Sequence, residues 1–207
     1  MKTKNILNEI VKDLKYPPGY SGWGFQMITF SRRASNGFHW PEVGVETNIY
    51  PLRENGTGGV LLGETWEEIS KDVRPSLNPK LLIAAYGTEE SERKDDVVRT
   101  PQAAVVSILD FIQVLRDQGR GADLRGIQLP SAWLANIDFS GADLREANLR
   151  NAQCAFANFD GADLRGADLG WTNFDGVTLR GADLRGARID YVDWGDADLS
   201  EAIQEEK

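Results

Sequence analysis

From Ala122 to Glu201 the chain reads ADLRG IQLPS AWLAN IDFSG ADLRE ANLRN AQCAF ANFDG ADLRG ADLGW TNFDG VTLRG ADLRG ARIDY VDWGD ADLSE, which is sixteen units of five residues. A longer period contains this one, because the string GADLR begins at Gly121, Gly141, Gly161 and Gly181. Self-similarity at a fixed period indicates a repeat architecture. A period of five within a period of twenty predicts a solenoid with four sides and four coils.

The third residue of each unit, its centre, is apolar throughout the repeat. The centres are Leu124, Leu144, Leu164 and Leu184 on side one; Leu129, Leu149, Leu169 and Ile189 on side two; Leu134, Cys154, Phe174 and Trp194 on side three; and Phe139, Phe159, Leu179 and Leu199 on side four. The first residue is Ala in eleven units and Ile, Val or Thr in the other five. Residues two apart in an extended segment share a face, so the first and third residues should point inward. A helix needs a period of about 3.6, so the pattern predicts a four-walled solenoid with a packed interior.

These units resemble the pentapeptide-repeat family, whose pattern is roughly Ala-(Asp/Asn)-(Leu/Phe)-x-x. The resemblance covers about residues 121–201 and implies a right-handed quadrilateral β-helix, usually without catalytic activity. Some members of the family resemble DNA in shape and charge and bind type II topoisomerases, so the resemblance implies such a partner as one candidate. Pro130 departs from the pattern. Because proline lacks an N–H, we expect the first coil to lose one hydrogen bond there.

The charge of the chain is concentrated on the repeat. The whole chain has a formal net charge of −9. Residues 122–201 contain 7 Arg and 14 Asp or Glu and so hold −7 of it. Such an acidic solenoid should repel nucleic acid and attract basic protein surfaces, so we expect no direct binding to nucleic acid.

The excess negative charge lies on two adjacent walls. Sides three and four each sum to −3, whereas side two is neutral and side one sums to −1. Side one has a column of Asp beside a column of Arg, which we expect to neutralise each other across the wall. The acidic residues predicted to bind a partner are Asp175, Asp193 and Asp196 on side three, and Asp138, Asp160 and Asp198 on side four.

Aromatic residues cluster beside that charge. Trp171 and Tyr191 both end side-two units twenty residues apart, so we expect them to stack at the corner between sides two and three. Phe156 ends a side-three unit, and Trp133 should point outward from side three. Exposed Trp and Tyr beside charge are typical of interfaces, so Trp171, Tyr191 and Trp133 join the predicted partner-binding residues. The alternative is that the N-terminal region covers Trp133 and that the pair merely protects a corner.

The segment before the repeat is predicted to be a mixed α+β domain. Apolar spacing predicts a helix over residues 4–15 and strands over 25–31 and 43–50. Capping signals predict helices over 65–73, 79–87 and 101–118, with a charged surface loop over 88–96. The last of these helices should cover the open end of the solenoid, whose strand edges would otherwise invite aggregation. The expected domains are therefore an α+β domain over 1–100, a capping helix over 101–118, the solenoid over 121–201 and a tail over 202–207.

Few residues suit catalysis or the binding of a cofactor. His39 is the only histidine and Cys154 the only cysteine, so a His/Cys zinc site is excluded. Cys154 occupies an inward centre position, where we expect it to behave as a small hydrophobe. The sequence contains no run of eighteen apolar residues, so no membrane span is predicted. The first residues lack the hydrophobic core of a signal peptide. A cytoplasmic protein without enzymatic activity or cofactor is therefore expected.

Three functions stay open at this point. The first is a protein-binding module whose acidic solenoid docks on a basic surface, in its sharpest form as a DNA mimic acting on DNA gyrase or another topoisomerase. Four coils spaced about 4.8 Å apart span roughly 20 Å, or about six base pairs with roughly twelve phosphates, so a homodimer through the C-terminal coil would make a longer mimic. The second is a scaffold, an effector or a phage- or host-defence factor in which the N-terminal domain acts and the solenoid is a platform. The third is an enzyme within residues 1–100.

Overall fold

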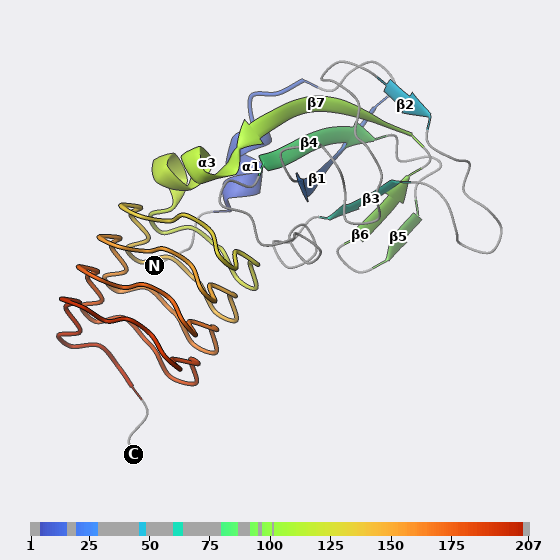
Figure 1. The fold of residues 1–207 in the computed structure, drawn as a ribbon. Helices are drawn as coiled ribbons and strands as arrows, with labels where there is room; N and C mark the ends of the chain where they lie inside the picture. Colours follow the sequence, from blue (N-terminus) through green and yellow to red (C-terminus); the bar gives the residue numbers. More distant parts are fainter. Residues whose placement is uncertain are drawn as a thin grey trace. The chain divides into compact units, whose positions relative to one another are not determined.

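The computed structural model describes residues 5–15, 20–28, 46–48, 60–63, 80–86, 92–94, 97–100 and 102–204 (Figure 1). The chain divides into two compact units. One comprises Met1–Glu9, Pro75–Asn78 and Phe111–Lys207, and the other comprises Ile10–Arg74 and Pro79–Asp110. The first unit contains the repeat and the second contains a β-sheet, so the two parts of the sequence with different periodicities fold into different units.

A seven-stranded antiparallel sheet dominates the second unit. Its strands are β1 (Gly22–Ile28), β2 (Glu46–Asn48), β3 (Val60–Gly63), β4 (Lys80–Tyr86), β5 (Glu92–Lys94), β6 (Val97–Thr100) and β7 (Gln102–Asp110), in the spatial order β2-β7-β4-β1-β3-β6-β5. β4 lies between β7 and β1 and pairs with β1 along its whole length, from Gly22 opposite Tyr86 to Ile28 opposite Lys80. The strands expected over 25–31 and 43–50 are thus present, with different ends. The helix expected over 65–73 lies outside the described residues.

Three expectations for this region are wrong. Residues 80–86, predicted as a helix, form strand β4, and residues 102–110, predicted as the first half of a long helix, form strand β7. Residues 92–94, predicted within a loop, form β5. A short run of apolar residues suits a buried strand as well as a helix, and the β-branched Val105, Val106 and Ile108 favour the strand. Inside β4 the side chains of Leu81 and Ile83 are almost fully buried, which agrees with a position between two neighbouring strands.

Two helices are described. Helix α1 (Ile6–Val11) confirms the helix expected over residues 4–15, in a shorter form, and Asn5 begins it by accepting a hydrogen bond from the backbone N–H of Asn8. Helix α3 (Phe111–Gln118) retains only the second half of the capping helix predicted over 101–118. Phe111, Ile112 and Leu115 of α3 are buried. The helix is shorter than expected because the chain stays extended until Asp110.

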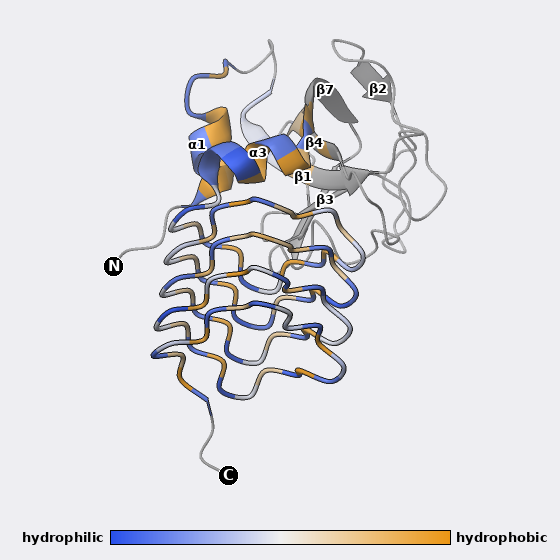
Figure 2. Cartoon of the chain, turned by 60° about the vertical axis from the view of Figure 1, so that its left-hand side comes forward, coloured by the Kyte–Doolittle hydropathy of each residue, from blue (hydrophilic) through white to orange (hydrophobic). Residues whose placement is uncertain are grey.

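Helix α3 belongs to the same unit as the repeat and leads directly into it. Gly119 ends the helix, and its N–H donates to the carbonyl of Leu115 at 2.8 Å. A side chain at Gly119 would lie 2.9 Å from the carbonyl oxygen of Asp138 and 3.4 Å from the ring of Phe139, so the end of the helix lies directly against the first coil. Figure 2 shows α3 above the first coil, as expected for a helix that covers this end.

The repeat winds into stacked coils (Figure 2), and the bridges between them join residues twenty apart. Parallel bridges join the second residue of a unit to the second residue of the unit twenty positions later, as in the series Asp123, Asp143, Asp163, Asp183 and Ile203. Within each coil a backbone bond such as Ile127 N–H to Leu124 carbonyl, at 3.2 Å, closes the corner. The second, third and fifth residues of the units donate their N–H groups to the neighbouring coils. The hydrogen bonds between coils therefore repeat with the twenty-residue period that the sequence predicts.

The centres line the interior, as the sequence predicts. Leu144 and Phe159 are almost completely buried, and so are the alanines at the first positions from Ala122 to Ala182. An aromatic column fills the core, with ring centroids 5.0 Å apart for Phe139 and Phe159, 5.4 Å for Phe159 and Phe174, and 5.6 Å for Phe174 and Trp194. Burial declines only at the far end, where Ile189 is 42% exposed and Ile203 is 47% exposed. The C-terminal end of the described solenoid is therefore its open end.

The fourth residue of each unit has a different partner for its N–H. In many units a side-chain oxygen of the second residue accepts it, as Asn148 Oδ1 does from the N–H of Arg150 at 3.1 Å and Asn158 Oδ1 does from that of Asp160 at 2.9 Å. This turn explains why Asp and Asn recur at the second position. It also corrects the expectation for Pro130. Since the fourth N–H is not part of the ladder between coils, proline there costs the first coil no ladder bond.

Candidate partner-binding surface

The exposed aromatic residues of the repeat surround side three. Trp133 is 52% exposed on that wall, Phe156 is 64% exposed at its corner with side four, and Trp171 and Tyr191 are 52% and 75% exposed at its corner with side two. The rings of Trp171 and Tyr191 stack with their centroids 4.5 Å apart and their planes at 24°. The expected stack is thus present. The alternative in which the N-terminal region covers Trp133 stays open.

Three of these aromatic residues adopt a left-handed backbone conformation. The φ angles are 61° at Phe156, 62° at Trp171 and 58° at Tyr191. They occupy the fifth position of their units, where glycine occurs in many other units, for example at Gly161 with φ of 64°. A residue with a Cβ in this conformation costs roughly 1–2 kcal/mol. Large, exposed aromatic side chains therefore stand where glycine would be less strained, and the fold alone does not require them.

Phe156 lies flat against the coil that follows it. A Cβ built on Gly176 would be 2.5 Å from two carbons of the Phe156 ring, so glycine at 176 makes room for this ring. The conformation of Gly176, with φ of 65°, also suits glycine. The sequence contains this signal, because the two residues are twenty apart in one column, yet Phe156 was not among the predicted partner-binding residues.

The acidic residues of side three have fewer partners within the protein than those of the other walls. Asp193 and Asp196 are exposed, and among the residues that the structure describes their carboxylates have no hydrogen-bond or ion-pair partner. Asp175 lies one coil above them, and its Oδ1 accepts the backbone N–H of Asp196 at 3.2 Å. Side three therefore combines uncompensated negative charge with an aromatic rim.

The acidic residues of side four are more strongly engaged. Arg180 donates from its backbone N–H to Asp160 Oδ1 at 3.0 Å and from its Nε to Asp198 Oδ2 at 2.6 Å. Asp138 Oδ1 accepts the backbone N–H of Ser140 at 2.9 Å. The sequence predicted that these carboxylates share one wall. Arg180, however, lies between two of them and reduces the negative electrostatic field that a partner would meet. Their partner-binding role stays a prediction.

The contact between Arg180 and Asp198 predicts a dependence of stability on pH. The hydrogen bond from Arg180 lowers the pKa of Asp198 to about 2, below its ordinary value of about 4. The resulting stabilisation is present above about pH 4 and is lost as the pH falls towards 2. We expect Arg180→Gln to lower the urea midpoint relative to wild type at pH 6, with the difference disappearing by about pH 2. High salt should shrink the difference at pH 6. A difference that stays constant from pH 6 to 2 would contradict this prediction.

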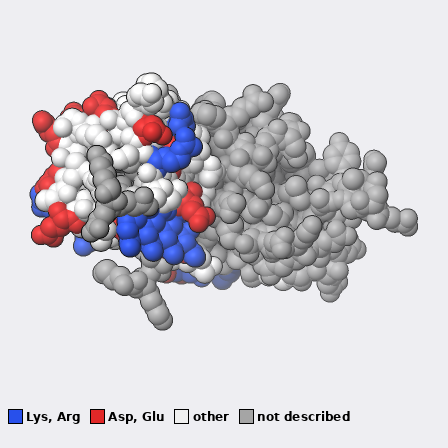
Figure 3. Space-filling view, turned by 90° about the horizontal axis from the view of Figure 1, so that it is seen from below, with Lys and Arg blue, Asp and Glu red and all other residues white. Residues whose placement is uncertain are grey.

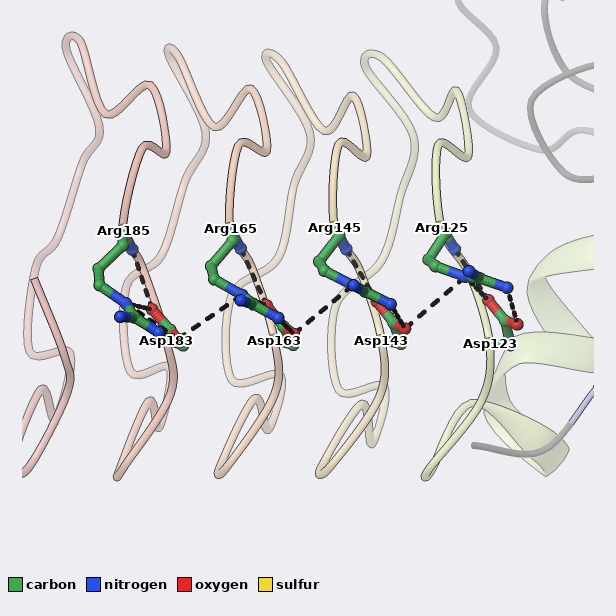
Figure 4. A network of polar contacts seen from close by, with 8 residues as sticks. All are labelled: Asp123, Arg125, Asp143, Arg145, Asp163, Arg165, Asp183 and Arg185. Carbon is green, nitrogen blue, oxygen red and sulfur yellow. Dashed lines mark hydrogen bonds and ion pairs between the residues drawn. The ribbon is translucent and has the colours of Figure 1, made fainter. Parts of the chain in front are cut away.

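Side one forms a continuous chain of opposite charges (Figure 4). Each arginine of this wall holds the aspartate two residues earlier through two N–H groups, as Arg165 does with Asp163 at 2.8 and 2.6 Å. Arg125, Arg145 and Arg165 also approach the aspartate of the next coil, with Arg165 Nε 3.7 Å from Asp183. The hydrogen bond from Arg165 lowers the pKa of Asp163 below its usual range. The wall neutralises itself along the coils as well as across them.

Charge is therefore distributed unevenly around the solenoid. Figure 3 shows one broad group of Lys and Arg on this face with smaller basic groups elsewhere, whereas Asp and Glu form separate clusters, several of them along the outline. On side two, Arg150 and Arg188 both lie near Asp168, at 3.7 and 3.5 Å. With sides one and two compensated and Arg180 on side four, side three retains the most uncompensated negative charge.

Other kinds of site find little support in the described residues. Cys154 is completely buried, and burial raises the pKa of its thiol, so it is not a reactive thiolate. Nowhere in the described part of the chain do three or more His, Cys, Asp or Glu side chains gather in a way that could hold a metal ion. Neither described helix has the length and apolar character that crossing a membrane requires.

A family model described as pentapeptide repeats, with 8 copies, matches residues 122–153, 142–181 and 152–190. The C-terminal region belongs to the pentapeptide-repeat family. The solenoid is accordingly a right-handed β-helix, the fold that the resemblance implied. Modules of the pentapeptide-repeat family are generally structural or binding modules. No curated protein matches the chain.

The solved structures that resemble the chain include other pentapeptide-repeat proteins. HetL, involved in regulation of heterocyst differentiation in the cyanobacterium Nostoc sp. strain PCC 7120, is 32% identical over 44% of this chain and 44% of its own, with a TM-score of 0.29. Rfr23 from the cyanobacterium Cyanothece 51142 is 29% identical over 41% of this chain and 58% of its own, with a TM-score of 0.24. A trypsin-treated variant of QnrB1, a plasmid-mediated fluoroquinolone resistance protein, is 16% identical over 41% of this chain and 51% of its own, with a TM-score of 0.17. The chain thus spans about half the length of these proteins.

Proposed function

We propose that the protein is a non-enzymatic, cytoplasmic binding module whose acidic solenoid docks on a basic protein surface, chiefly through side three. The observation that supports this most directly is the aromatic rim of that wall. Phe156, Trp171 and Tyr191 are exposed and hold backbone conformations that glycine would adopt with less strain. Beside them Asp193 and Asp196 offer uncompensated charge. Interfaces combine aromatic anchors with complementary charge in this way.

The sharpest form of the proposal is mimicry of DNA towards DNA gyrase or another DNA-binding protein. The repeat has a net charge of −7 over four coils, so a basic channel that accepts a DNA backbone is a suitable partner. Two copies that pair through the C-terminal coil would form a longer mimic. The exposure of Ile189 and Ile203 at that end supports such pairing.

The proposal is tested by reversing charge on side three. We expect the wild-type protein to bind DNA gyrase at low salt and to alter its supercoiling of DNA. The double variant Asp193→Lys, Asp196→Lys should bind at least about tenfold more weakly, because two like charges would then face a basic surface. The matched control is Asp117→Lys, Glu146→Lys, which changes the net charge equally on α3 and side one and should bind within about twofold of wild type.

The outcomes separate the open functions. Absence of binding to gyrase at low salt would reject the topoisomerase form of the proposal. If the partner is instead captured from the native host and both double variants bind it equally, side three is not the docking surface. The unit that contains Ile10–Arg74 and Pro79–Asp110 would then be the part to investigate, with the solenoid as its platform.

A further inference from the structure

The stack of Trp171 and Tyr191 ends in an open ring face. Trp171 covers one face of the Tyr191 ring at a centroid distance of 4.5 Å. Tyr191 nevertheless remains 75% exposed, whereas Trp171 is 52% exposed. In the same column, one coil above Trp171, Asn151 donates its side-chain amide to Ser131 Oγ at 3.0 Å. Ser131 and Asn151 therefore occupy the positions before Trp171 in this vertical row of side chains. The free ring face of the aromatic pair is the face of Tyr191 that points away from Trp171.

Carboxylates flank this ring in the chain. Asp190 directly precedes Tyr191, and its side chain is 64% exposed. Within the described ranges, its carboxylate makes a single, long ion-pair contact, at 3.9 Å to Arg188. Asp193 follows two residues later on side three, and its carboxylate has no partner within the described part of the chain. An incoming cation at the ring face would thus find one carboxylate on each side of the corner.

We infer that the Trp171–Tyr191 stack receives an arginine side chain of the basic partner. A guanidinium is planar, so it can lie on the Tyr191 face and continue the stack while its N–H groups pair with a carboxylate. A lysine ammonium meets the same charge, but it has no planar surface to stack and binds as a point charge. The inference rests on the proposed function and specifies its partner chemistry, an arginine-bearing segment rather than any basic segment.

The conformation of Tyr191 makes a clean test available. Because its φ is 58°, glycine fits the position without strain, so Tyr191→Gly removes the ring and should leave the fold intact. Asn136→Gly is the matched control, since Asn136 is also exposed and has φ of 60° but lies at the other corner of side three. Circular dichroism and a melting curve on each variant would verify that both remain folded.

The experiment uses the full chain and two labelled nine-residue peptides of equal charge, one with four arginines separated by glycine and one with four lysines. Fluorescence anisotropy at low salt should give a dissociation constant about two- to fivefold lower for the arginine peptide. Tyr191→Gly should abolish this preference, and Asn136→Gly should preserve it. Asp193→Asn should weaken the binding of both peptides. Sedimentation at the same protein concentration would show whether a second copy occupies the end of the solenoid.

Equal affinity for the two peptides, a preference that survives in Tyr191→Gly, or no binding of either peptide would overturn the inference. If the arginine and lysine peptides bind with equal affinity and both bind more weakly to Asp193→Asn, the acidic docking surface would be supported. Only the arginine site would then be rejected. The proposed function fails separately, when reversing the charge of Asp193 and Asp196 has no effect on binding of the basic protein.

Discussion

Replacing Phe159 by alanine is expected to lower the free energy of unfolding of the repeat unit by about 3–5 kcal/mol. The side chain is fully buried and lies between Phe139, at 5.0 Å between ring centroids, and Phe174, at 5.4 Å. Its removal would leave a cavity in a rigid stack, because neighbouring coils are held at a fixed spacing by their backbone bonds. The cost therefore includes the lost contacts as well as the lost transfer free energy of the ring.

The matched control is Phe156→Ala, three residues earlier in the same coil. Phe156 is 64% exposed, so its replacement should change the free energy of unfolding by no more than about 0.5 kcal/mol. Urea denaturation followed by far-ultraviolet circular dichroism and by tryptophan fluorescence would measure both variants. Similar losses for the two variants would contradict the placement of the core and the surface.

A second large effect is expected from proline at the second position of a unit. Asn148 donates its backbone N–H to the carbonyl of Ile127 at 2.8 Å, and this bond joins two coils. Asn148→Pro removes the donor and should cost about 3 kcal/mol or more. The side chain of Asn148 also bonds Gln128 at 3.0 Å, so two links between coils would be lost.

Proline two residues later should be tolerated. Arg150 occupies the position that Pro130 holds one coil earlier, and leucine precedes both residues. The backbone N–H of Arg150 bonds only to Asn148 Oδ1, at 3.1 Å. We expect Arg150→Pro to cost less than about 1 kcal/mol, with urea midpoints as the measurement for the pair. If the two proline variants proved equally destabilising, the assignment of the fourth N–H to a position outside the ladder would be wrong.

The repeat was predictable because each of its positions experiences the same environment many times. A single inward Leu144 proves little, but sixteen apolar centres at one spacing leave few alternative folds. The sheet offered no such repetition. Residues 102–110 contain enough apolar side chains for either a strand or a helix. They form a strand because they pair with β4 and β2, and the local sequence does not show this pairing.

The candidate surface was predictable only in outline. Wall by wall, the sequence located the acidic residues and the stack of Trp171 on Tyr191. It did not show that Arg180 would bind both Asp160 and Asp198, since that depends on side-chain geometry between coils. The strain at Phe156, Trp171 and Tyr191 could have been inferred, because glycine is by far the commonest residue at the fifth position and aromatic residues there are exceptions.

The bridges between residues twenty apart have a consequence for how such a chain can change in length. Insertion of one twenty-residue copy would keep every later residue on its own wall and simply lengthen the surface. Insertion of a single five-residue unit would preserve the interior equally well, because any unit presents an apolar centre. It would, however, move every later unit to the next wall of the solenoid, which is a rotation of a quarter turn about the solenoid axis. Asp193 and Tyr191 would then lie on other walls than Trp133 and Trp171. Duplication of whole coils can therefore enlarge the proposed docking surface, while duplication of single units would distribute its residues over different walls.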